Sequence, residues 1–330
     1  MKTNSKKKIL PLIIGAVILL ALPFVAQMIT GNDYWVLILC TMLIYVIAVS
    51  GLDILFGYSG QISLGHASFY VIAAYTTGLL NNYFNIPLFI TIPCGAILAA
   101  LLGAALAYPA SRLKFHFLSL ATVAFGEITY YFLYTSPGGF TNDYKGINIR
   151  SIPFLEGSYT KWYFWLLLWA IIFVVAKIFI VNSRTGRAFI AIRENTHAAD
   201  GMGVNVQKYK ILAFAISAFY VGFAGTMYAH LYKYISPETA RQKQSVLFLT
   251  MMLFGGSGSI VGSMIGVVII EILLELIRPL QEYQMLLYGI LLLIVIIALP
   301  GGIVGGVRDV MADRAKRKLQ KEGEGGAQNG

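Results

Sequence analysis

Long apolar runs with very few charges dominate this sequence, and they constrain its fold more than any other feature. Of the 330 residues, 58% are hydrophobic and only 12% are Asp, Glu, Lys or Arg, about half the charge of an average soluble domain. So few charged side chains cannot cover a water-soluble domain of this size. Because a membrane-spanning helix takes about 20 apolar residues, the sequence predicts an all-α polytopic membrane protein with about ten transmembrane helices.

Ten apolar runs are the candidates for these helices, and the eighth of them is short. The runs are Ile9–Ile29, Tyr34–Phe56, Ile62–Leu80, Pro87–Tyr108, Phe115–Thr135, Trp162–Val181, Ile211–Tyr232, Val246–Phe254, Ile260–Ile277 and Met285–Leu299. The first run follows four lysines as a signal peptide does. It is longer than the apolar region of a signal peptide, and no small-residue cleavage site precedes Asp33. We therefore expect an uncleaved first span.

The basic residues indicate the orientation of these spans, because cytoplasmic loops gather Lys and Arg. With the N-terminus inside and ten crossings, 18 of the 25 basic residues lie inside, and the other seven are Lys145, Arg150, Lys161, Lys233, Arg241, Lys243 and Arg278. A single crossing over 246–277 would place the basic C-terminal cluster outside. We therefore expect two crossings there and both termini in the cytoplasm. Orientation then explains the net charge of +10 without a nucleic-acid partner.

This topology divides the chain into three parts. A basic cytoplasmic N-terminus spans 1–8, a transmembrane domain spans 9–305 and a charged cytoplasmic tail spans 306–330. Within the transmembrane domain, 136–161 is an external loop and 182–209 is an internal loop whose pattern is helical and amphipathic.

Sequence signatures of an enzyme or a metal site are missing from the chain. The nearest approach to a Walker A motif, GSGSIVGS over 256–263, lacks the lysine that reaches the phosphates. The four histidines and the two cysteines, Cys40 and Cys94, have no metal-ligand spacing. We expect no catalytic residue and no metal or cofactor bound by this chain, and it does not hydrolyse ATP by itself.

Small residues over 57–66, in the stretch GYSGQISLGH, allow the backbone to bend or unwind. Peptide groups freed inside a membrane need polar surroundings, and broken helices of this kind line substrate paths in many transporters. Close helix packing alone is the alternative. A similar stretch, GGSGSI, lies over 255–260 in the other half of the chain. The candidate path residues from these stretches are Gly57, Gly60, Gln61, Ser63, Gly65, His66, Gly255, Gly256 and Gly258.

Ionisable residues inside a span are costly and are therefore functional candidates. Glu127 lies in the middle of the fifth run, and we add it to the candidate path. The alternatives are a protonated Glu127 bonded to a neighbouring helix and a His66 that caps the broken backbone. Farther along, Glu271, Glu275 and Arg278 have the spacing of an intrahelical salt bridge.

The internal loop carries a small-residue stripe that suits docking to a partner. Ala188, Ala191, Ile192 and Asn195 share one helical face, and Asp200, Gly201 and Gly203 follow where a helix ends. Such an element can fit a cleft on a cytoplasmic partner. The alternative is a helix lying on lipid, with Phe189 and Ile190 as anchors.

At these residues the chain resembles the LivM-type permease subunits of branched-chain amino acid ABC transporters, from about Tyr34 to Gly305. The motifs that carry the resemblance are GYSGQISLGHASFYVIAAY (57–75), FHFLSLATVAFGEI (115–128), SRTGRAFIAIRENTHAADGMGVNVQKYKILAF (183–214) and FGGSGSIVGSMIG (254–266). The resemblance implies a subunit of the bacterial cytoplasmic (inner) membrane that shares its substrate path with a second, homologous permease. It also implies two partner subunits that bind and use ATP, and an extracytoplasmic solute-binding protein.

The resemblance further implies that 186–203 is the loop that couples the permease to its ATPases. Ala198, Ala199 and Gly203 match the Ala-Ala and terminal Gly positions of that loop. The full set implied for coupling is Gly186, Ala188, Ala191, Arg193, Glu194, Asn195, Ala198, Ala199 and Gly203. The chain departs from the family's pattern at two places. Ile190-Ala191-Ile192 stands where an acidic residue often opens the coupling motif, and TNDYKGI (141–147) stands in place of a TGG-x-x-GI pattern. The second bears on substrate choice or on docking of the binding protein.

These observations predict a permease subunit that imports branched-chain or related amino acids. Two alternatives stay open at the level of the sequence. One is a stand-alone ion-coupled transporter or channel, and the other is an importer of the same family for urea, amides or aromatic acids.

Overall fold

The computed structural model describes residues 19–28, 31–111 and 115–283, with single positions between 286 and 305. Its α-helices are Leu19–Met28, α2 (Tyr34–Asp53), α3 (His66–Phe84), α4 (Leu88–Ala110), α5 (Phe115–Thr135), α6 (Tyr159–Asn182), α7 (Arg184–Glu194), α8 (Thr196–Gly201), α9 (Val206–Tyr232), α10 (Gln242–Gly255) and α11 (Ile260–Ile277). A π-helical turn, η1 (Ile54–Tyr58), continues α2, and 3-10 turns lie at Asp143–Lys145, Pro153–Leu155, Pro237–Ala240 and Arg278–Tyr283. Two short strands, β1 (Ile147–Asn148) and β2 (Tyr234–Ile235), pair antiparallel.

Six of the described helical segments are long and apolar enough to cross a membrane. They are Tyr34–Tyr58, Leu88–Ala110, Phe117–Thr135, Tyr159–Asn182, Val206–Tyr232 and Ile260–Ile277. These segments establish an all-α polytopic membrane protein. The count of ten crossings stays a prediction, since the first run is described only from 19 to 28, and most of 285–299 and the tail lie outside the described residues.

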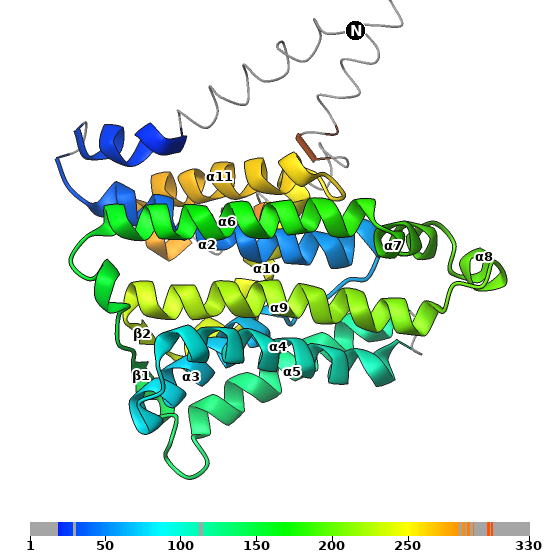
Figure 1. Cartoon of the computed structure of the whole chain (residues 1–330), viewed down its shortest axis with the longest axis horizontal. Coiled ribbons are helices and arrows are strands. Elements are labelled where there is room, and N and C mark those ends of the chain that lie inside the picture. Colours follow the sequence, from blue (N-terminus) through cyan, green and yellow to red (C-terminus); the bar gives the residue numbers. More distant parts are fainter. Residues whose placement is uncertain are drawn as a thin grey trace, which may run out of the picture.

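The helices α2 and α9 form the centre of the bundle and are buried over most of their length. In Figure 1, α6 and α2 run alongside α9, and α3, α4 and α5 lie on the other side of it. Glycine permits the closest approaches. A Cβ at Gly225 of α9 would meet the carbonyl of Tyr70 on α3, and one at Gly51 of α2 would meet the side chain of Tyr220 on α9. The core is therefore built from closely packed small residues and large aromatic ones.

The apolar region 246–277 forms two helices that pack antiparallel. Gly255 lies against Gly262, and Gly266 lies against Met251, so positions advance in opposite directions along α10 and α11. Residues 256–259 form the turn, where Gly256 and Gly258 adopt positive φ. The predicted break at this glycine-rich stretch is confirmed.

The bundle has two distinct ends. At the end that we call the strand end, β1 pairs with β2 in the register Ile147↔Ile235 and Asn148↔Tyr234. At the opposite end, which we call the turn end, α7 and α8 lie beyond the end of α6 (Figure 1) and near the turns after α2 and α10. The loops that the sequence assigns to opposite sides of the membrane thus group at opposite ends of the bundle.

Candidate functional site

The chain leaves helical geometry between η1 and α3, as the small residues predict. Residues 59–65 are non-helical, and Gly60 adopts φ +72°. Side chains from other helices satisfy some of the freed backbone: Thr122 Oγ1 accepts a hydrogen bond from the Leu64 amide at 3.1 Å. The side-chain Nε2 of Gln61 donates to Ser59 Oγ at 2.6 Å and to the Lys210 carbonyl at 3.2 Å. The unwound stretch is thus held in place by α5 and α9.

His66 is fully buried at the start of α3. Its Nδ1 lies 2.8 Å from Ser63 Oγ, and its Nε2 lies 2.8 Å from Ser217 Oγ of α9. The rings of Phe69 and Phe214 pack on it at 5.6 Å. In this structure His66 therefore joins the unwound stretch to α9, and a role in the substrate path stays a prediction.

Glu127 lies on the outer face of α5 and is exposed. Large apolar side chains surround it along this face, namely Phe117, Leu120, Ile128 and Tyr131. Glu127 makes no hydrogen bond or ion pair with the residues that the structure describes. The bond to a neighbouring helix of the same chain, which the sequence left open, is therefore not among the described contacts, and the carboxylate faces away from the bundle.

The internal loop folds as two short helices with side-chain caps. Ser183 Oγ accepts from the Thr185 and Gly186 amides at the start of α7, and Asn195 Oδ1 accepts from the His197 and Ala198 amides at the start of α8. These caps satisfy amides that have no partner within a helix. Gly203 then adopts φ +83° after α8, so the predicted helix and terminal turn are confirmed.

The small-residue stripe of this loop mostly faces the chain itself, since Ala191 is partly buried and only Asn195 of its four residues is exposed. Ala188 and Ile192 are buried, and Ala199 is only 4% exposed. Phe189 is fully buried with its ring edge-on to Tyr209, so it cannot serve as a lipid anchor. The stripe turns inward because α7 and α8 bury their apolar positions against the start of α9. The surface left free carries Ile190, His197, Ala198 and Met202, the last 86% exposed.

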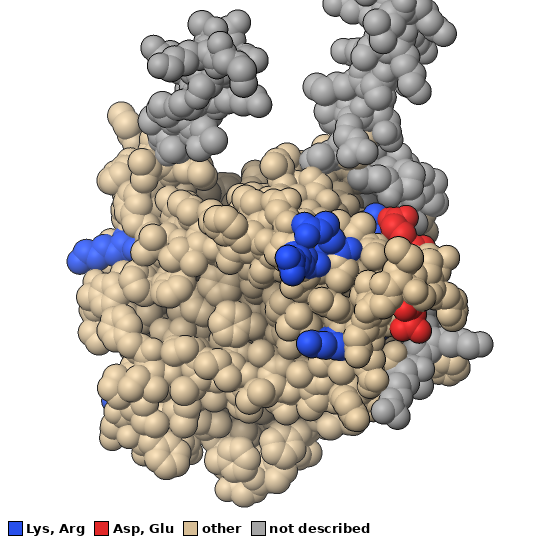
Figure 2. Space-filling view, turned by 45° about the vertical axis from the view of Figure 1, so that its right-hand side comes forward, with Lys and Arg blue, Asp and Glu red and all other residues tan. Residues whose placement is uncertain are grey.

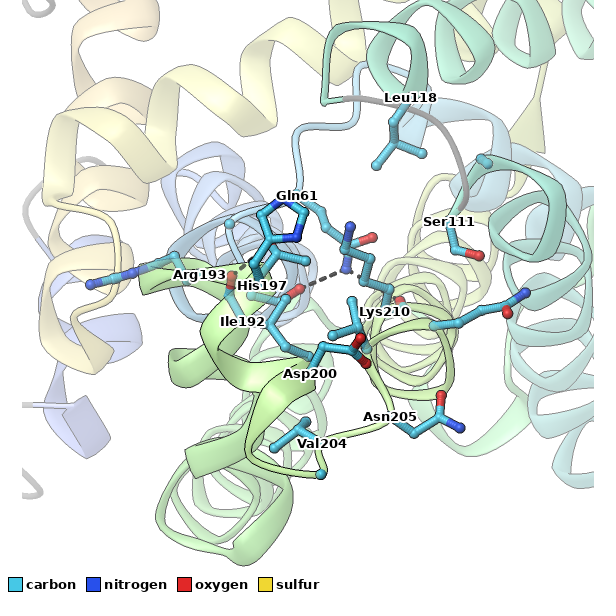
Figure 3. Close-up of a pocket in the computed structure, with 17 residues that line it drawn as sticks. Gln61, Ser111, Leu118, Ile192, Arg193, His197, Asp200, Val204, Asn205 and Lys210 are labelled. Carbon is cyan, nitrogen blue, oxygen red and sulfur yellow. Dashed lines mark hydrogen bonds between the residues drawn. The ribbon is translucent and has the colours of Figure 1, made fainter.

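A hollow of about 890 Å³ opens at the turn end between this loop, the unwound stretch and α4 (Figure 3). The side chains of Gln61, His197 and Asp200 gather there (Figure 3). Its described lining is Ser59, Gly60, Gln61, Ala110, Ser111, Leu118, Ile192, Arg193, Thr196, His197, Asp200, Gly203, Val204, Asn205, Val206, Gln207 and Lys210. The hollow therefore joins part of the candidate path to part of the candidate coupling set.

A buried ion pair that no sequence motif indicates lies beside this site. Asp53 at the end of α2 and Lys177 on α6 are both 0% exposed, and the Lys177 Nζ lies 2.8 Å from Asp53 Oδ2. The other carboxylate oxygen accepts from the Gly258 amide at 2.7 Å, and Lys177 donates to Ser263 Oγ at 3.0 Å. The available signal was that each residue is a lone charge inside an apolar run. Their pairing requires the fold.

The two similar glycine stretches meet at this ion pair. A Cβ at Gly57 would collide with Asp53 Oδ1 and with the backbone of Gly258. Arg193 of α7 reaches the same place and donates a hydrogen bond to the Gly57 carbonyl. The turn end thus brings together Gly57, Gly60 and Gly258 with Arg193, while Glu127 lies apart on α5.

The other described ion pairs are all more exposed than the pair of Asp53 and Lys177. Arg278 pairs with Glu275 at 3.4 Å, which confirms part of the intrahelical pairing that the spacing predicts. Among the described residues, no group of three or more His, Cys, Asp or Glu is arranged to hold a metal ion. Figure 2, which brings the α7 and α8 end forward, shows few charged side chains on a broad uncharged surface.

An apolar bundle with six helices long enough to cross a membrane defines a multi-pass membrane protein. The family model described as the permease component of branched-chain amino acid transport systems matches residues 34–296. The chain belongs to this family, and it is a permease subunit of an ABC importer.

Individual relatives support the same assignment. The chain is 31% identical over 289 residues to the high-affinity branched-chain amino acid transport system permease protein LivM of Escherichia coli, covering 79% of this chain and 68% of the relative. A probable branched-chain amino acid transport permease protein LivM of Methanocaldococcus jannaschii is 26% identical over 312 residues, with 85% and 88% covered. The permease protein LivH of Escherichia coli is 33% identical over 144 residues, with 42% and 46% covered. No solved structure matches the chain at a significant level.

Proposed function

We propose that this permease subunit carries branched-chain amino acids across the bacterial cytoplasmic membrane into the cell. The observation that carries the proposal is the similarity to LivM proteins, which are transport system permeases for these amino acids and match most of the chain. The departure at 141–147 lies at the strand end, where a solute-binding protein would deliver substrate. Related substrates, such as amides or aromatic acids, are therefore part of the test.

The helices α7 and α8 would contact the ATP-binding subunits. Both helices are fixed by caps at their first turns, and both project beyond the transmembrane helices. A rigid element transmits motion that a loose loop would absorb. Because Ala188, Ile192 and Ala199 face inward, the contact would use the outer surface. Met202 and Ile190 are exposed apolar groups there, and His197 is exposed as well. The coupling residues are thus divided between an inner face that fixes the loop and an outer face that meets the partner.

The outer face of α5 would line the path that the chain shares with a second permease. A carboxylate that faces lipid in mid-span costs several kcal/mol. The exposed position of Glu127 therefore favours contact with water or with a partner protein. The partial match to LivH is consistent with a partner permease of the same family. Glu127→Gln keeps the hydrogen-bonding shape of a protonated acid and should support transport far better than Glu127→Leu. Equal transport by the two variants would mean that Glu127 only fills space.

The turn end would face the cytoplasm together with both termini. The 18-to-7 partition of basic residues supports this orientation. A cysteine introduced at Lys318 should then resist a membrane-impermeant thiol reagent in intact cells. Ready labelling of Lys318→Cys would overturn the ten-span topology.

The proposal as a whole is tested by reconstitution with candidate ATP-binding subunits, the second permease and the solute-binding protein. Leucine, isoleucine and valine should stimulate ATP hydrolysis and enter proteoliposomes, whereas urea, short amides and aromatic acids should do so weakly. Transport that persists without the ATP-binding subunits would instead indicate an ion-coupled carrier. Stimulation only by an amide or an aromatic acid would move the chain to another branch of the family.

A further inference from the structure

The buried ion pair at the turn end is not explained by transport of a neutral or zwitterionic substrate. Asp53 and Lys177 are fully buried and face each other, so the pair is inaccessible to a substrate in this conformation. A buried ion pair is weak evidence for stability, because desolvation offsets much of the attraction. Its role is therefore better sought in what the pair holds together.

The pair and its hydrogen bonds connect four separate elements, namely α2, α6, the 256–259 turn and α11. Asp53 ends α2, and Lys177 lies near the end of α6, which leads through Ser183 directly into α7. The Asp53 carboxylate accepts from Gly258 in the turn between α10 and α11, and Lys177 reaches Ser263 on α11. Motion of any one of these elements must therefore either carry the others along or break a buried charged bond.

Arg193 adds the loop that would meet the ATP-binding subunits. Its guanidinium donates to the Gly57 carbonyl in η1, and a Cβ at Gly258 would lie 3.3 Å from the same Nη1 atom. The aliphatic part of Arg193 also packs on Gly60, where a Cβ would lie 2.8 Å from Cγ. One side chain of α7 thus contacts two glycine turns, residues 57–60 and residues 256–259. Each of these glycine turns adjoins Asp53 directly.

We propose that Asp53 and Lys177 are positioning residues that hold the two glycine turns against α7, so that a displacement of α7 moves both turns together. The essential bond is the one from Gly258 to Asp53, since it joins the turn of the C-terminal half to the end of α2. The charge itself serves to hold the carboxylate in place between Lys177 and Gly258. This inference rests on the proposed contact of α7 with the ATP-binding subunits.

Two neutral double variants separate this linkage from simple relief of buried charge. Asp53→Asn with Lys177→Gln keeps an acceptor for Gly258 and a donor for Ser263, because both new side chains are amides. Asp53→Leu with Lys177→Met is equally neutral but removes the acceptor. As the matched control, Glu156→Gln breaks the exposed pair with Lys233 at the strand end.

The readout is the number of substrate molecules transported per ATP hydrolysed in reconstituted complexes, measured together with recovery of the ATP-binding subunits. We expect the amide pair and Glu156→Gln to stay within about threefold of the unmodified protein, and the apolar pair to fall at least tenfold while still retaining the ATP-binding subunits. Equal coupling by the two double variants would overturn the proposal, as would loss of the ATP-binding subunits from the apolar pair alone, because the defect would then be in assembly. If the unmodified chain fails to retain the ATP-binding subunits, the proposed function fails instead.

A cross-check uses the backbone of the C-terminal turn. In the assembled complex, hydrogen exchange at the Gly258 amide should be slow in the unmodified protein and in the amide pair, and at least tenfold faster in the apolar pair. Unchanged exchange in the apolar pair would show that Asp53 does not hold this turn.

Discussion

The ion pairs at the strand end are exposed, whereas the turn end combines the exposed pair of Arg193 and Glu194 with a fully buried one. At the strand end, Lys233 pairs with Glu156 at 3.0 Å, and the two side chains are 50% and 60% exposed. Arg241 pairs with Glu238 in a similar setting. At the turn end, Asp53 and Lys177 pair at almost the same distance, 2.8 Å, but with no exposure. Distance alone therefore says little about an ion pair, because its surroundings decide whether its loss is tolerated.

The largest effect should follow from Lys177→Met, which leaves the Asp53 carboxylate buried without its cation. Breaking a buried pair from one side costs about 3–5 kcal/mol. We therefore expect a loss of this size in the free energy of unfolding, measured by denaturant unfolding in detergent. A loss below about 1 kcal/mol would mean that water reaches Asp53, and the contrast between the two ends would disappear.

A smaller effect should follow from Gly57→Ala at the contact between the two glycine turns. The added Cβ would meet Asp53 Oδ1 and the Gly258 backbone, and neither can move without disturbing the ion pair. Overpacking of this kind costs about 1–3 kcal/mol. The control is Gly126→Ala on α5, where the nearest atom to a Cβ is Ser68 Oγ at 3.6 Å. Equal melting temperatures of the two variants would contradict the close contact of the turns.

Gly203→Val tests a different need for glycine at the same end. Apart from its chain neighbours, no described residue has an atom within 4 Å of a Cβ at Gly203, so the positive φ of +83° is what opposes the substitution. That strain costs about 1–2 kcal/mol, which we expect as local loosening of α8, measured by hydrogen exchange of its amides. Gly201→Val, at a position that is also open but lacks positive φ, is the control. Equal exchange in both variants would show that the turn tolerates a side chain.

The smallest effect should follow from Glu156→Gln at the strand end. Exposed ion pairs contribute about 0–1 kcal/mol, and salt screens them. We expect a change in the free energy of unfolding within this range, which shrinks further at 1 M salt. A salt-independent loss above about 2 kcal/mol would show that the strand end is dry and would remove the distinction between the ends.

Hydropathy and small-residue patterns predicted much of this fold. The unwound stretch after α2, the break at 256–259 and the terminal turn at Gly203 are local features, and glycine chemistry is enough to locate them. The inward orientation of Ala199 was not predictable in this way, because an alanine stripe fits a partner's cleft and the chain's own α9 equally well. The outward orientation of Glu127 likewise depends on which helices pack beside α5.

The ion pair shows most clearly what a sequence pattern leaves undetermined. From its position alone, Lys177 is one of the basic residues expected on the cytoplasmic side, and Asp53 is a single charge in an apolar run. The contact arises because α2 packs against α6 and because Gly57 and Gly258 let two turns approach each other. Long-range packing of this kind has no periodic signal in the chain.

The wide spacing of the ion pair along the chain also sets an order of events during synthesis. Asp53 and Lys177 are 177 minus 53, or 124, residues apart, so at about 5–20 residues per second the ribosome reaches the lysine about 6–25 s after the aspartate. Ser263 follows another 86 residues later. During that interval Asp53 must stay hydrated or take up a proton, because its cation does not yet exist. The charged contact between α2 and α6 can therefore form only after α6 has been made, when more than half of the chain has been synthesised.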